Sequence, residues 1–330
     1  MTRTELMQNW LQQQFPDGGW SIEPASADAS FRRYFRVTAN GSSHIVMDAP
    51  PQHEDCGPFL HVAQIFAAAG VHVPEIIAQN LQQGFLLLSD LGHTTYLDAI
   101  DDSNADSLYM DAIDALIRIQ LASRPDVLPV YDDALLRREL QLFPEWYAGK
   151  HARVELSSSQ RDVLERTFSL IVLNNLAQTR VYVHRDYHSR NLMLSAPNPG
   201  ILDFQDAVYG PITYDLASLF KDAYIRWDEE RVLDWCIRYW ERARKAGLPV
   251  NADFHDFYRD FEWMGVQRHI KVLGIFARLC HRDGKDAYLK DMPLVMTYLR
   301  KACERYSGLG SLLRLLDELE NRQTAVGYSF

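Results

Sequence analysis

Three side chains that carry oxygen atoms stand at fixed spacing within residues 181–206, which read VYVHRDYHSRNLMLSAPNPGILDFQD. They are Asp186, Asn191 and Asp203. Short apolar runs flank the polar loop that presents Asp186 and Asn191, and a proline-rich turn leads into a third apolar run that delivers Asp203. We therefore expect short strands whose connections bring these side chains to one end of a small sheet.

The order and spacing of these residues indicate phosphoryl transfer. In a kinase-type catalytic loop of the form H-R-D-x-x-x-x-N, the aspartate lies beside the attacking hydroxyl and the asparagine binds a metal ion, while a later D-F-x turn supplies a second metal ligand. Asp186 would then be the catalytic base, and Asn191 and Asp203 would hold Mg²⁺ against the phosphates of ATP. Each residue alone would more often cap a turn or end a strand, but the combination predicts an ATP-dependent phosphotransferase.

Residues on either side of this set are expected to support it. His184 opens the catalytic loop, and Asp215 lies in the first turn of a helix predicted within 209–220. A carboxylate at Asp215 is expected to accept backbone N–H bonds from the loop rather than to do chemistry. His188, in the same loop, is a candidate substrate contact. Asp206 could bind either the metal or the substrate, and the sequence leaves both roles open.

Composition limits the class of protein. The chain has 330 residues, of which 47% are hydrophobic and 24% are charged, so it is long enough for two lobes with a substantial core. Its four cysteines are scattered and include no CxxC pair, which indicates neither a zinc site nor a disulfide framework and fits a reducing cytoplasm. The formal charge of −10 argues against nonspecific nucleic-acid binding, which needs a basic surface.

The sequence also carries no signal for export or membrane attachment. Its N-terminal segment is amphipathic, and no stretch approaches the length needed to span a bilayer. A cytoplasmic protein without an obligate protein partner is the expectation.

Hydrophobic periodicity predicts an α+β chain, and the kinase-type spacing of Asp186, Asn191 and Asp203 makes a bilobal, protein-kinase-like fold the expectation. Residues 1–88 would form a nucleotide-binding N-lobe with an antiparallel sheet and a helix, 89–93 a hinge, and 94–330 a larger, mainly helical C-lobe. Strands are predicted at 20–24, 31–37, 43–49, 73–80 and 84–92, and helices at 2–15, 57–69, 109–119, 134–148, 158–177, 229–245, 252–281 and 287–306.

Two backbone segments are expected to contact the nucleotide. At the hinge, backbone groups of Ser89, Asp90 and Leu91 would meet adenine. In kinase-like N-lobes the turn between the first two strands covers the phosphates with backbone N–H groups, and here that turn is 26–30. Because the turn has small residues, including Ser30, but no glycine, an ordinary hairpin is at least as well supported.

The phosphate-binding lysine of a kinase is missing from the N-lobe. The first lysine of the chain is Lys150, so none can pair with the α- and β-phosphates from the third strand. Arg32 or Arg33 could replace it, because a guanidinium suits bidentate phosphate contact, although either could lie on a solvated edge. Glu54 and Asp55 precede the next helix, where acids commonly favour the helix N-terminus and could also pair with a phosphate-binding arginine.

Candidate substrate contacts come from two helical segments. In the first, Glu139 and Glu145 could accept hydrogen bonds from sugar hydroxyls, and Trp146 could stack on a pyranose. An amphipathic helix with a buried tryptophan is at least as well supported there. In the second, Arg268 and Lys271 lie one turn apart and could together hold an anionic substrate group.

Residues 181–220 resemble the aminoglycoside phosphotransferase superfamily, whose members share a protein-kinase-like fold. The blocks DASFRRYFRV, LRRELQLFPEWY and MGVQRHIKVLGIFARL narrow the resemblance to bacterial anomeric N-acetylmuramate/N-acetylglucosamine kinases of cell-wall recycling. The resemblance spans about Trp20–Leu299 and implies ATP, Mg²⁺, a cytoplasmic setting and an amino sugar phosphorylated at its C1 hydroxyl. Arg185 and Gln205 stand where the broader superfamily has glycines.

Two other functions stay compatible with the sequence. A cationic aminoglycoside could be the acceptor, which would require a pocket walled by carboxylates, and the basic segment 268–282 weighs against it. The chain could also be a nucleotide-binding regulatory protein without turnover, because it lacks the lysine and the glycines. The presence of Asp186, Asn191 and Asp203 weighs against that function.

Overall fold

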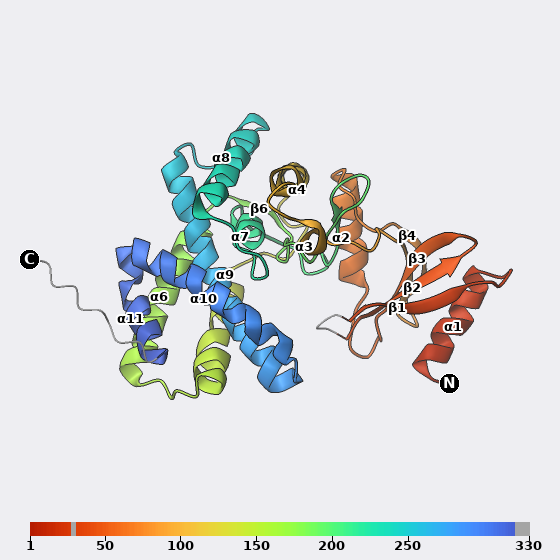
Figure 1. Ribbon diagram of the computed structural model, residues 1–330, viewed down its shortest axis with the longest axis horizontal. Helices are drawn as coiled ribbons and strands as arrows, with labels where there is room; N and C mark the ends of the chain where they lie inside the picture. The colour runs from red at the N-terminus through yellow and green to blue at the C-terminus, as the bar shows by residue number, and fades with distance from the viewer. Residues whose placement is uncertain (28–30, 321–330) are drawn as a thin grey trace, which may run out of the picture. The chain divides into compact units, whose positions relative to one another are not determined.

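Two units make up the chain in the computed structural model, which describes residues 1–27 and 31–320 (Figure 1). Unit 1 comprises Met1–Ile119 and Arg190–Asp206, and unit 2 comprises Gln120–Ser189 and the residues from Ala207 onward. The bounds of these units differ from those of the predicted lobes. Residues 94–119 and 190–206 fall within the predicted C-lobe but belong to unit 1. The hinge at 89–93 stays a prediction.

Unit 1 is built on a five-stranded sheet in the order β1-β2-β3-β5-β4, in which every neighbouring pair is antiparallel. This arrangement confirms the predicted antiparallel sheet. Helix α1 packs on one face of the sheet, where Trp10 lies in a buried core with Val37, Val46 and Phe85 (Figure 1). The elements of unit 1 are α1 (Arg3–Gln14), β1 (Ser21–Ala27), β2 (Arg33–Ala39), β3 (Ser42–Asp48), α2 (Gly57–Ala68), β4 (Ile76–Asn80), β5 (Phe85–Ser89), α3 (Tyr96–Ala99), most of α4 (Ala105–Leu121), β7 (Leu192–Met193) and β8 (Gly200–Ile201).

Unit 2 is mainly helical, as predicted, and its long helix α9 contacts η1, α10, α7, α6 and α5 (Figure 1). A two-stranded antiparallel sheet pairs β6 with β9 and leads into the predicted catalytic loop. Within the described residues, no helix is both long and apolar enough to cross a membrane. The elements of unit 2 are α5 (Asp133–Leu140), the π-helix η1 (Phe143–His151), α6 (Ser158–Leu176), β6 (Arg180–Val183), β9 (Val208–Pro211), α7 (Tyr214–Phe220), α8 (Glu229–Lys245), α9 (Phe254–Asp283), the 3₁₀ helix η2 (Asp286–Asp291), α10 (Met292–Arg305), the 3₁₀ turn η3 (Ser307–Leu309) and α11 (Gly310–Leu319).

Two helix predictions need correction, and a third is confirmed. The predicted helix 134–148 is interrupted after α5, and η1 begins with Pro144 in its first turn, because proline has no N–H to continue the α-helical ladder. The helix predicted at 287–306 begins as the 3₁₀ helix η2 before α10. The helix predicted within 209–220 is α7, which has Asp215 in its first turn as expected. The residues before it form β9, where Val208 pairs with Val183.

Gly274 lets α9 approach the turn between α5 and η1. A Cβ at Gly274 would lie 2.6 Å from the Leu142 Cβ and 2.7 Å from the Leu142 carbonyl oxygen. We therefore expect Gly274→Ala to lower the free energy of unfolding by about 1–3 kcal/mol through overpacking, measured by denaturant titration. Gly265→Ala is the matched control on the same helix, because its Cβ would meet Lys221 at an ordinary 3.5 Å. Equal stability of the two variants would contradict the prediction.

Candidate active site

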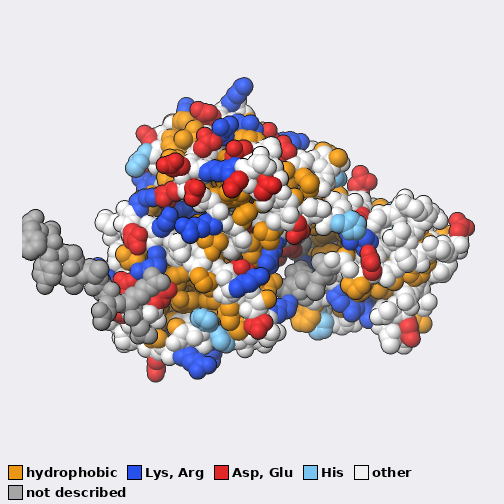
Figure 2. All heavy atoms as spheres, viewed as in Figure 1, with side chains coloured by type: hydrophobic (Ala, Val, Ile, Leu, Met, Phe, Trp, Pro, Cys, Tyr) orange, Lys and Arg blue, Asp and Glu red, His pale blue; other side chains and the backbone are white. Residues whose placement is uncertain are grey.

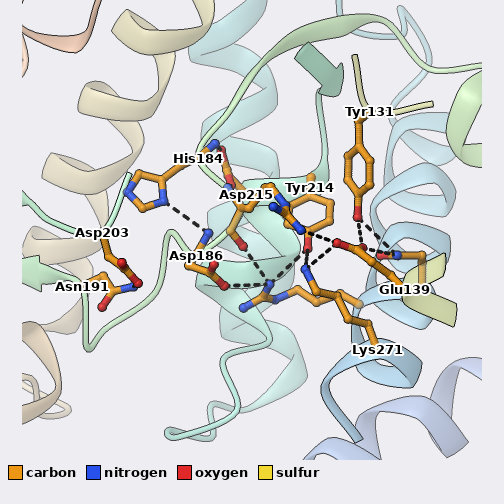
Figure 3. Close-up of polar contacts among 12 residues, drawn as sticks. Tyr131, Glu139, His184, Asp186, Asn191, Asp203, Tyr214, Asp215 and Lys271 are labelled. Atoms are coloured by element: carbon orange, nitrogen blue, oxygen red, sulfur yellow. Dashed lines mark hydrogen bonds and ion pairs between the residues drawn. The ribbon is translucent and has the colours of Figure 1, made fainter. Parts of the chain in front are cut away.

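The catalytic loop leaves strand β6 at His184 and is held by Asp215 from the first turn of α7. Asp215 is buried, and its two carboxylate oxygens accept the N–H of His184 at 2.7 Å and the N–H of Arg185 at 3.0 Å. The Nδ1 atom of His184 in turn accepts the N–H of Asp186 at 3.2 Å (Figure 3). This geometry is the support that the sequence predicts for His184 and Asp215.

A second carboxylate, Asp222, holds the other end of the loop. This role was not predicted from the sequence. Its Oδ2 accepts the N–H of Ser189 at 2.9 Å and the Ser189 hydroxyl at 2.5 Å, and both residues are buried. Its Oδ1 accepts the N–H of Tyr224 at 3.0 Å. Asp222 and Asp215 therefore fix the loop from both ends, over a sequence separation that leaves no local signal.

Asp186 lies in a positive electrostatic field. Its side chain is 37% exposed, and its Oδ1 is 3.7 Å from Nη1 of Arg268. Desolvation by the surrounding protein opposes ionisation, but nearby cations, chiefly Lys271 and Arg268, outweigh it and hold the pKa of Asp186 well below its usual range. The carboxylate is thus ionised at neutral pH, as a proton acceptor requires.

Glu139 is surrounded by protein donors. It is only 5% exposed, it binds the Arg185 guanidinium and the Tyr131 hydroxyl, and it accepts bonds from Lys271 at 3.0 Å and from Gln267 at 2.9 Å (Figure 3). Burial opposes its ionisation, but Lys271 and Arg185 outweigh this and lower the pKa of Glu139 to about 2. The predicted contact of Glu139 with sugar hydroxyls is therefore not supported, because protein groups already use its oxygens.

Arg268 and Lys271 are also engaged with the protein. Both side chains are buried; Nη1 of Arg268 donates to the carbonyl of Arg185 at 2.8 Å, and Nζ of Lys271 donates to the Tyr214 hydroxyl at 2.9 Å. The geometry does not support the predicted direct hold of these cations on an anionic substrate group. They instead fix groups next to Asp186 and lower its pKa.

The other predicted substrate contacts are Glu145, Trp146, His188 and Asp206, of which only His188 belongs to the loop that carries Asp186. Glu145 and Trp146 are on η1, where Glu145 is exposed and Trp146 is half-buried. His188 is half-buried and packs edge-on against Tyr224, with ring centroids 5.5 Å apart. Asp206 is exposed in the segment after β8. The substrate roles of these four residues stay predictions.

The predicted metal ligands meet in unit 1, where β7 pairs with β8. Nδ2 of Asn191 lies 3.3 Å from Oδ2 of Asp203 (Figure 3). Nε2 of Gln205 donates to the other Asp203 oxygen at 2.6 Å. Asp203 has a φ of 60°, in the left-handed region, so its carboxylate is held in a strained turn. One carboxylate and one amide oxygen fit Mg²⁺, which is commonly bound by one or two carboxylates together with water and substrate phosphates.

Arg32 forms an ion pair that resembles the lysine–glutamate pair of a kinase. Its Nη2 lies 2.9 Å from Oε2 of Glu54, and Oε1 of Glu54 accepts the N–H of Phe31 at 3.2 Å. Asp55 instead accepts the N–H of Gly57, the first residue of α2, at 2.8 Å. Glu54 thus has the pairing that the sequence left open. Ser30 lies outside the described residues, so its predicted phosphate contact stays a prediction.

Arg33 is on the face of the sheet that α1 covers. Its guanidinium lies 2.5 Å from the buried carboxylate of Asp48, which also pairs with Arg3 at 2.6 Å. Because side chains at every second position of a strand share a face, Arg33 lies on the same face of β2 as Val37, which belongs to the core beneath α1. The prediction of Arg33 as a phosphate ligand is therefore not supported, because its partner is a structural carboxylate.

The predicted adenine segment is held firmly at its centre. The Asp90 carboxylate accepts bonds from Nε of Arg36 at 2.6 Å, from the Ser43 hydroxyl at 2.5 Å and from the N–H of Gly92 at 3.0 Å. Desolvation raises the pKa of Asp90, but the hydrogen bonds from Arg36, Ser43 and Gly92 lower it by more, so the pKa lies below its ordinary value. Any adenine contact of Asp90 would thus have to use its backbone. For Ser89, Asp90 and Leu91 the contact stays a prediction.

Comparisons with known proteins agree with this arrangement. A family model described as "Phosphotransferase enzyme family" matches residues 21–248. The N-acetylmuramate/N-acetylglucosamine kinase of Pseudomonas putida is 51% identical over 328 residues, covering 96% of this chain and 97% of that protein. The protein of the same name from Neisseria meningitidis is 48% identical over 336 residues, covering 100% of both chains.

Solved structures show the same fold. The GDP complex of wild-type aminoglycoside 2'-phosphotransferase-IIIa has a TM-score of 0.62 at 15% identity and covers 93% of this chain and 100% of that chain. The ADP-bound aminoglycoside phosphotransferase APH(2'')-Ib has a TM-score of 0.59 at 14% identity and covers 88% of this chain and 96% of that chain. At these identities the likeness concerns the fold alone, and it confirms the predicted protein-kinase-like class.

Proposed function

Because this chain belongs to the phosphotransferase enzyme family, we propose that it is an ATP-dependent kinase that phosphorylates the C1 hydroxyl of N-acetylmuramate or N-acetylglucosamine. The observation that carries the proposal is the geometry of Asp186, which is fixed in a loop of kinase spacing and lies 3.7 Å from the Arg268 guanidinium. Relatives that match nearly the whole chain bear the name of this kinase. A role in peptidoglycan recycling in the cytoplasm follows from the same proposal.

Asp186 would orient the sugar hydroxyl and accept its proton. Since the low pKa of Asp186 makes it a weak base, its main effect is to align the attacking oxygen, and the proton moves late in the reaction. An anomeric hydroxyl is more acidic than an ordinary alcohol, which suits a weak base. Asn191 and Asp203 would hold Mg²⁺, which when bound neutralises charge on the β- and γ-phosphates.

The charges around Asp186 favour an amino sugar over an aminoglycoside. Arg185, Arg268 and Lys271 lie within the cluster that surrounds the Asp186 and Glu139 carboxylates. A polycationic acceptor would be repelled by these cations, whereas a neutral or anionic sugar would not. This charge distribution supports the same conclusion as the basic segment of the sequence.

A single assay tests the proposal. ATP consumption is measured with N-acetylmuramate, N-acetylglucosamine and kanamycin, and ³¹P NMR places the phosphate in each product. We expect a C1 phosphate from at least one of the two amino sugars and none from kanamycin. A kanamycin product alone would identify an aminoglycoside phosphotransferase, and no product from any acceptor would favour the regulatory function.

Asp215 should make the reaction sensitive to pH near neutrality. Burial raises the pKa of Asp215 to about 7, although the N–H groups of His184 and Arg185 oppose the shift. Because the ionised form accepts both N–H groups, we expect kcat to fall on acidification with a midpoint near pH 7. A kcat that is constant from about pH 8 to about pH 6 would contradict this expectation.

The same titration should change stability in the opposite direction. The folded-state pKa lies above the ordinary value, so the contribution of Asp215 to stability is fully present at low pH and is lost as the pH rises through about 7. The melting temperature of the unchanged chain minus that of Asp215→Asn should therefore decrease between about pH 5 and pH 8. A difference that grows with pH would show that Asp215 has a lowered pKa.

A further inference from the structure

Arg185, the residue immediately before the proposed base, has a backbone conformation that an L residue rarely adopts. Its φ is 79°, in the left-handed region where glycine alone has no steric penalty. An arginine at such a position needs a compensating interaction, and its Nη2 atom makes one with the carboxylate of Glu139. The guanidinium therefore does something that a glycine at this position could not do.

The backbone of Arg185 is held as firmly as its side chain. Its N–H donates to Asp215 at 3.0 Å, and its carbonyl accepts a bond from Nη1 of Arg268 at 2.8 Å. Asp215 belongs to α7, Arg268 to α9 and Glu139 to α5. Three helices of unit 2 thus meet at the residue that precedes Asp186 (Figure 3).

Glu139 is a rigid anchor for the guanidinium. Besides Arg185 it binds Lys271 at 3.0 Å, Gln267 at 2.9 Å and the Tyr131 hydroxyl. Tyr131 packs against Gly210, where a Cβ would come within 2.7 Å of the tyrosine. Rotation of the buried Glu139 carboxylate would leave two cations without their counter-charge, so the anchor has one favoured orientation.

The Glu139 network differs from the ion pairs on the described surface of unit 2 because most of its members are buried. Figure 2 shows charges of both signs interspersed over the face in view. The Arg238–Asp234 pair of α8 is an exposed ion pair of this unit. Such exposed pairs contribute little. The Glu139 network is instead buried, and it ends on the peptide that carries the base.

We propose that Arg185 is a positioning residue for phosphoryl transfer. Its side chain is fixed by Glu139 and its backbone by Arg268 and Asp215, and this holds the side chain of Asp186 in one orientation. The inference rests on the proposed function, since it concerns the same reaction. Phosphoryl transfer depends mainly on alignment, so a small displacement of Asp186 lowers kcat without weakening nucleotide binding.

The test separates the side chain of Arg185 from its backbone conformation. Arg185→Gly removes the guanidinium and also removes the strain of the left-handed φ. We expect kcat to fall by about tenfold or more with the KM for ATP unchanged. The melting temperature should also fall, because the buried Glu139 carboxylate loses one of its partners. Arg185→Lys should recover part of the lost kcat, because an ammonium group can still pair with Glu139.

Arg153→Gly is the matched control for this exchange. Arg153 also belongs to unit 2, has a φ of 56° and is exposed, so the substitution relieves the same kind of strain without touching Glu139. Its kcat should equal that of the unchanged chain. Adding Glu139→Gln to Arg185→Gly should lower kcat little further, because the two side chains act as a unit.

Two results would overturn the inference. One is full kcat in Arg185→Gly, which would show that the backbone conformation alone positions Asp186. The other is an equal loss of kcat in the glycine and lysine variants together with equally lowered melting temperatures, which would show general destabilisation. Failure of the proposed function is distinct, because it would appear as absence of sugar phosphate from the unchanged chain.

Discussion

Asp186→Asn should fold and bind ATP like the unchanged chain, and should lose at least about 100-fold in kcat. The amide has nearly the shape of the carboxylate but cannot accept a proton, and its NH₂ group would turn a donor toward the attacking hydroxyl. The loop itself should persist, because its backbone bonds to Asp215 and Asp222 do not involve the side chain of Asp186.

The charge balance predicts a modest loss of stability in this variant. Asp186 is ionised and attracts Lys271 and Arg268, so removing its charge removes a favourable interaction in the folded state. Both cations keep other partners, Glu139 for Lys271 and the Arg185 carbonyl for Arg268. The melting temperature should therefore fall slightly while the chain stays folded.

The measurement is single-turnover transfer from ATP, with the nucleotide Kd determined separately. Asp234→Asn is a suitable control, because Asp234 is a 50% exposed carboxylate of α8 that pairs with Arg238 on the same helix. It should keep its full rate. Near-full activity in Asp186→Asn would remove Asp186 from the role of base and would reopen the choice of catalytic carboxylate.

The catalytic loop could be predicted because its information is local. Asp186 and Asn191 are five positions apart, and the apolar runs on both sides require strands whatever the remaining chain does. The support by Asp215 could also be predicted, since a carboxylate in the first turn of a helix readily accepts N–H bonds. Both predictions depend on short-range rules.

The environment of Glu139 could not be predicted in the same way. A glutamate on an amphipathic helix is ordinarily exposed, and its burial here depends on Arg185 and Lys271, which are distant in the sequence. Residue type and spacing are the same for a substrate-binding carboxylate and for an anchored one. Only the tertiary structure distinguishes them.

The position of Arg33 could be predicted only in part from the sequence. Alternation puts Arg33 on the same side of β2 as Val37 and puts Arg32 on the other side. Which side is covered depends on the docking of α1, whose Trp10 packs in the core with Val37. An apolar residue two or four positions along the strand was the available signal that Arg33 lies on the side of the sheet that α1 covers.

Arg32→Ala is expected to raise the KM for ATP by about 10- to 100-fold, the scale of one charge-assisted phosphate contact. This expectation concerns unit 1 alone: with no lysine before Lys150, the ion pair of Arg32 with Glu54 would take the place of a lysine paired with a helix carboxylate. An arginine held by a carboxylate presents its remaining N–H groups in a fixed direction, which suits binding of an α- or β-phosphate.

Arg33→Ala, at the residue next to Arg32, should affect the stability of the chain and not phosphate binding. Asp48 is fully buried and would lose one of its two arginine partners, so the variant should melt at a lower temperature while its KM for ATP stays unchanged. Arg32→Ala should instead raise the KM for ATP, and its melting temperature should also fall, because the Glu54 side chain is only 12% exposed and loses its arginine partner. The two alanine variants are thus controls for each other.

Glu54→Gln completes the argument, because it keeps Arg32 and removes only the charge that orients it. We expect a smaller rise in the KM for ATP than in Arg32→Ala, and no further rise when the two substitutions are combined, since both act through one pair. If both alanine variants, at Arg32 and at Arg33, kept the KM of the unchanged chain, neither arginine would bind phosphate. Binding of the phosphates would then have to come from backbone N–H groups and from the metal held by Asn191 and Asp203.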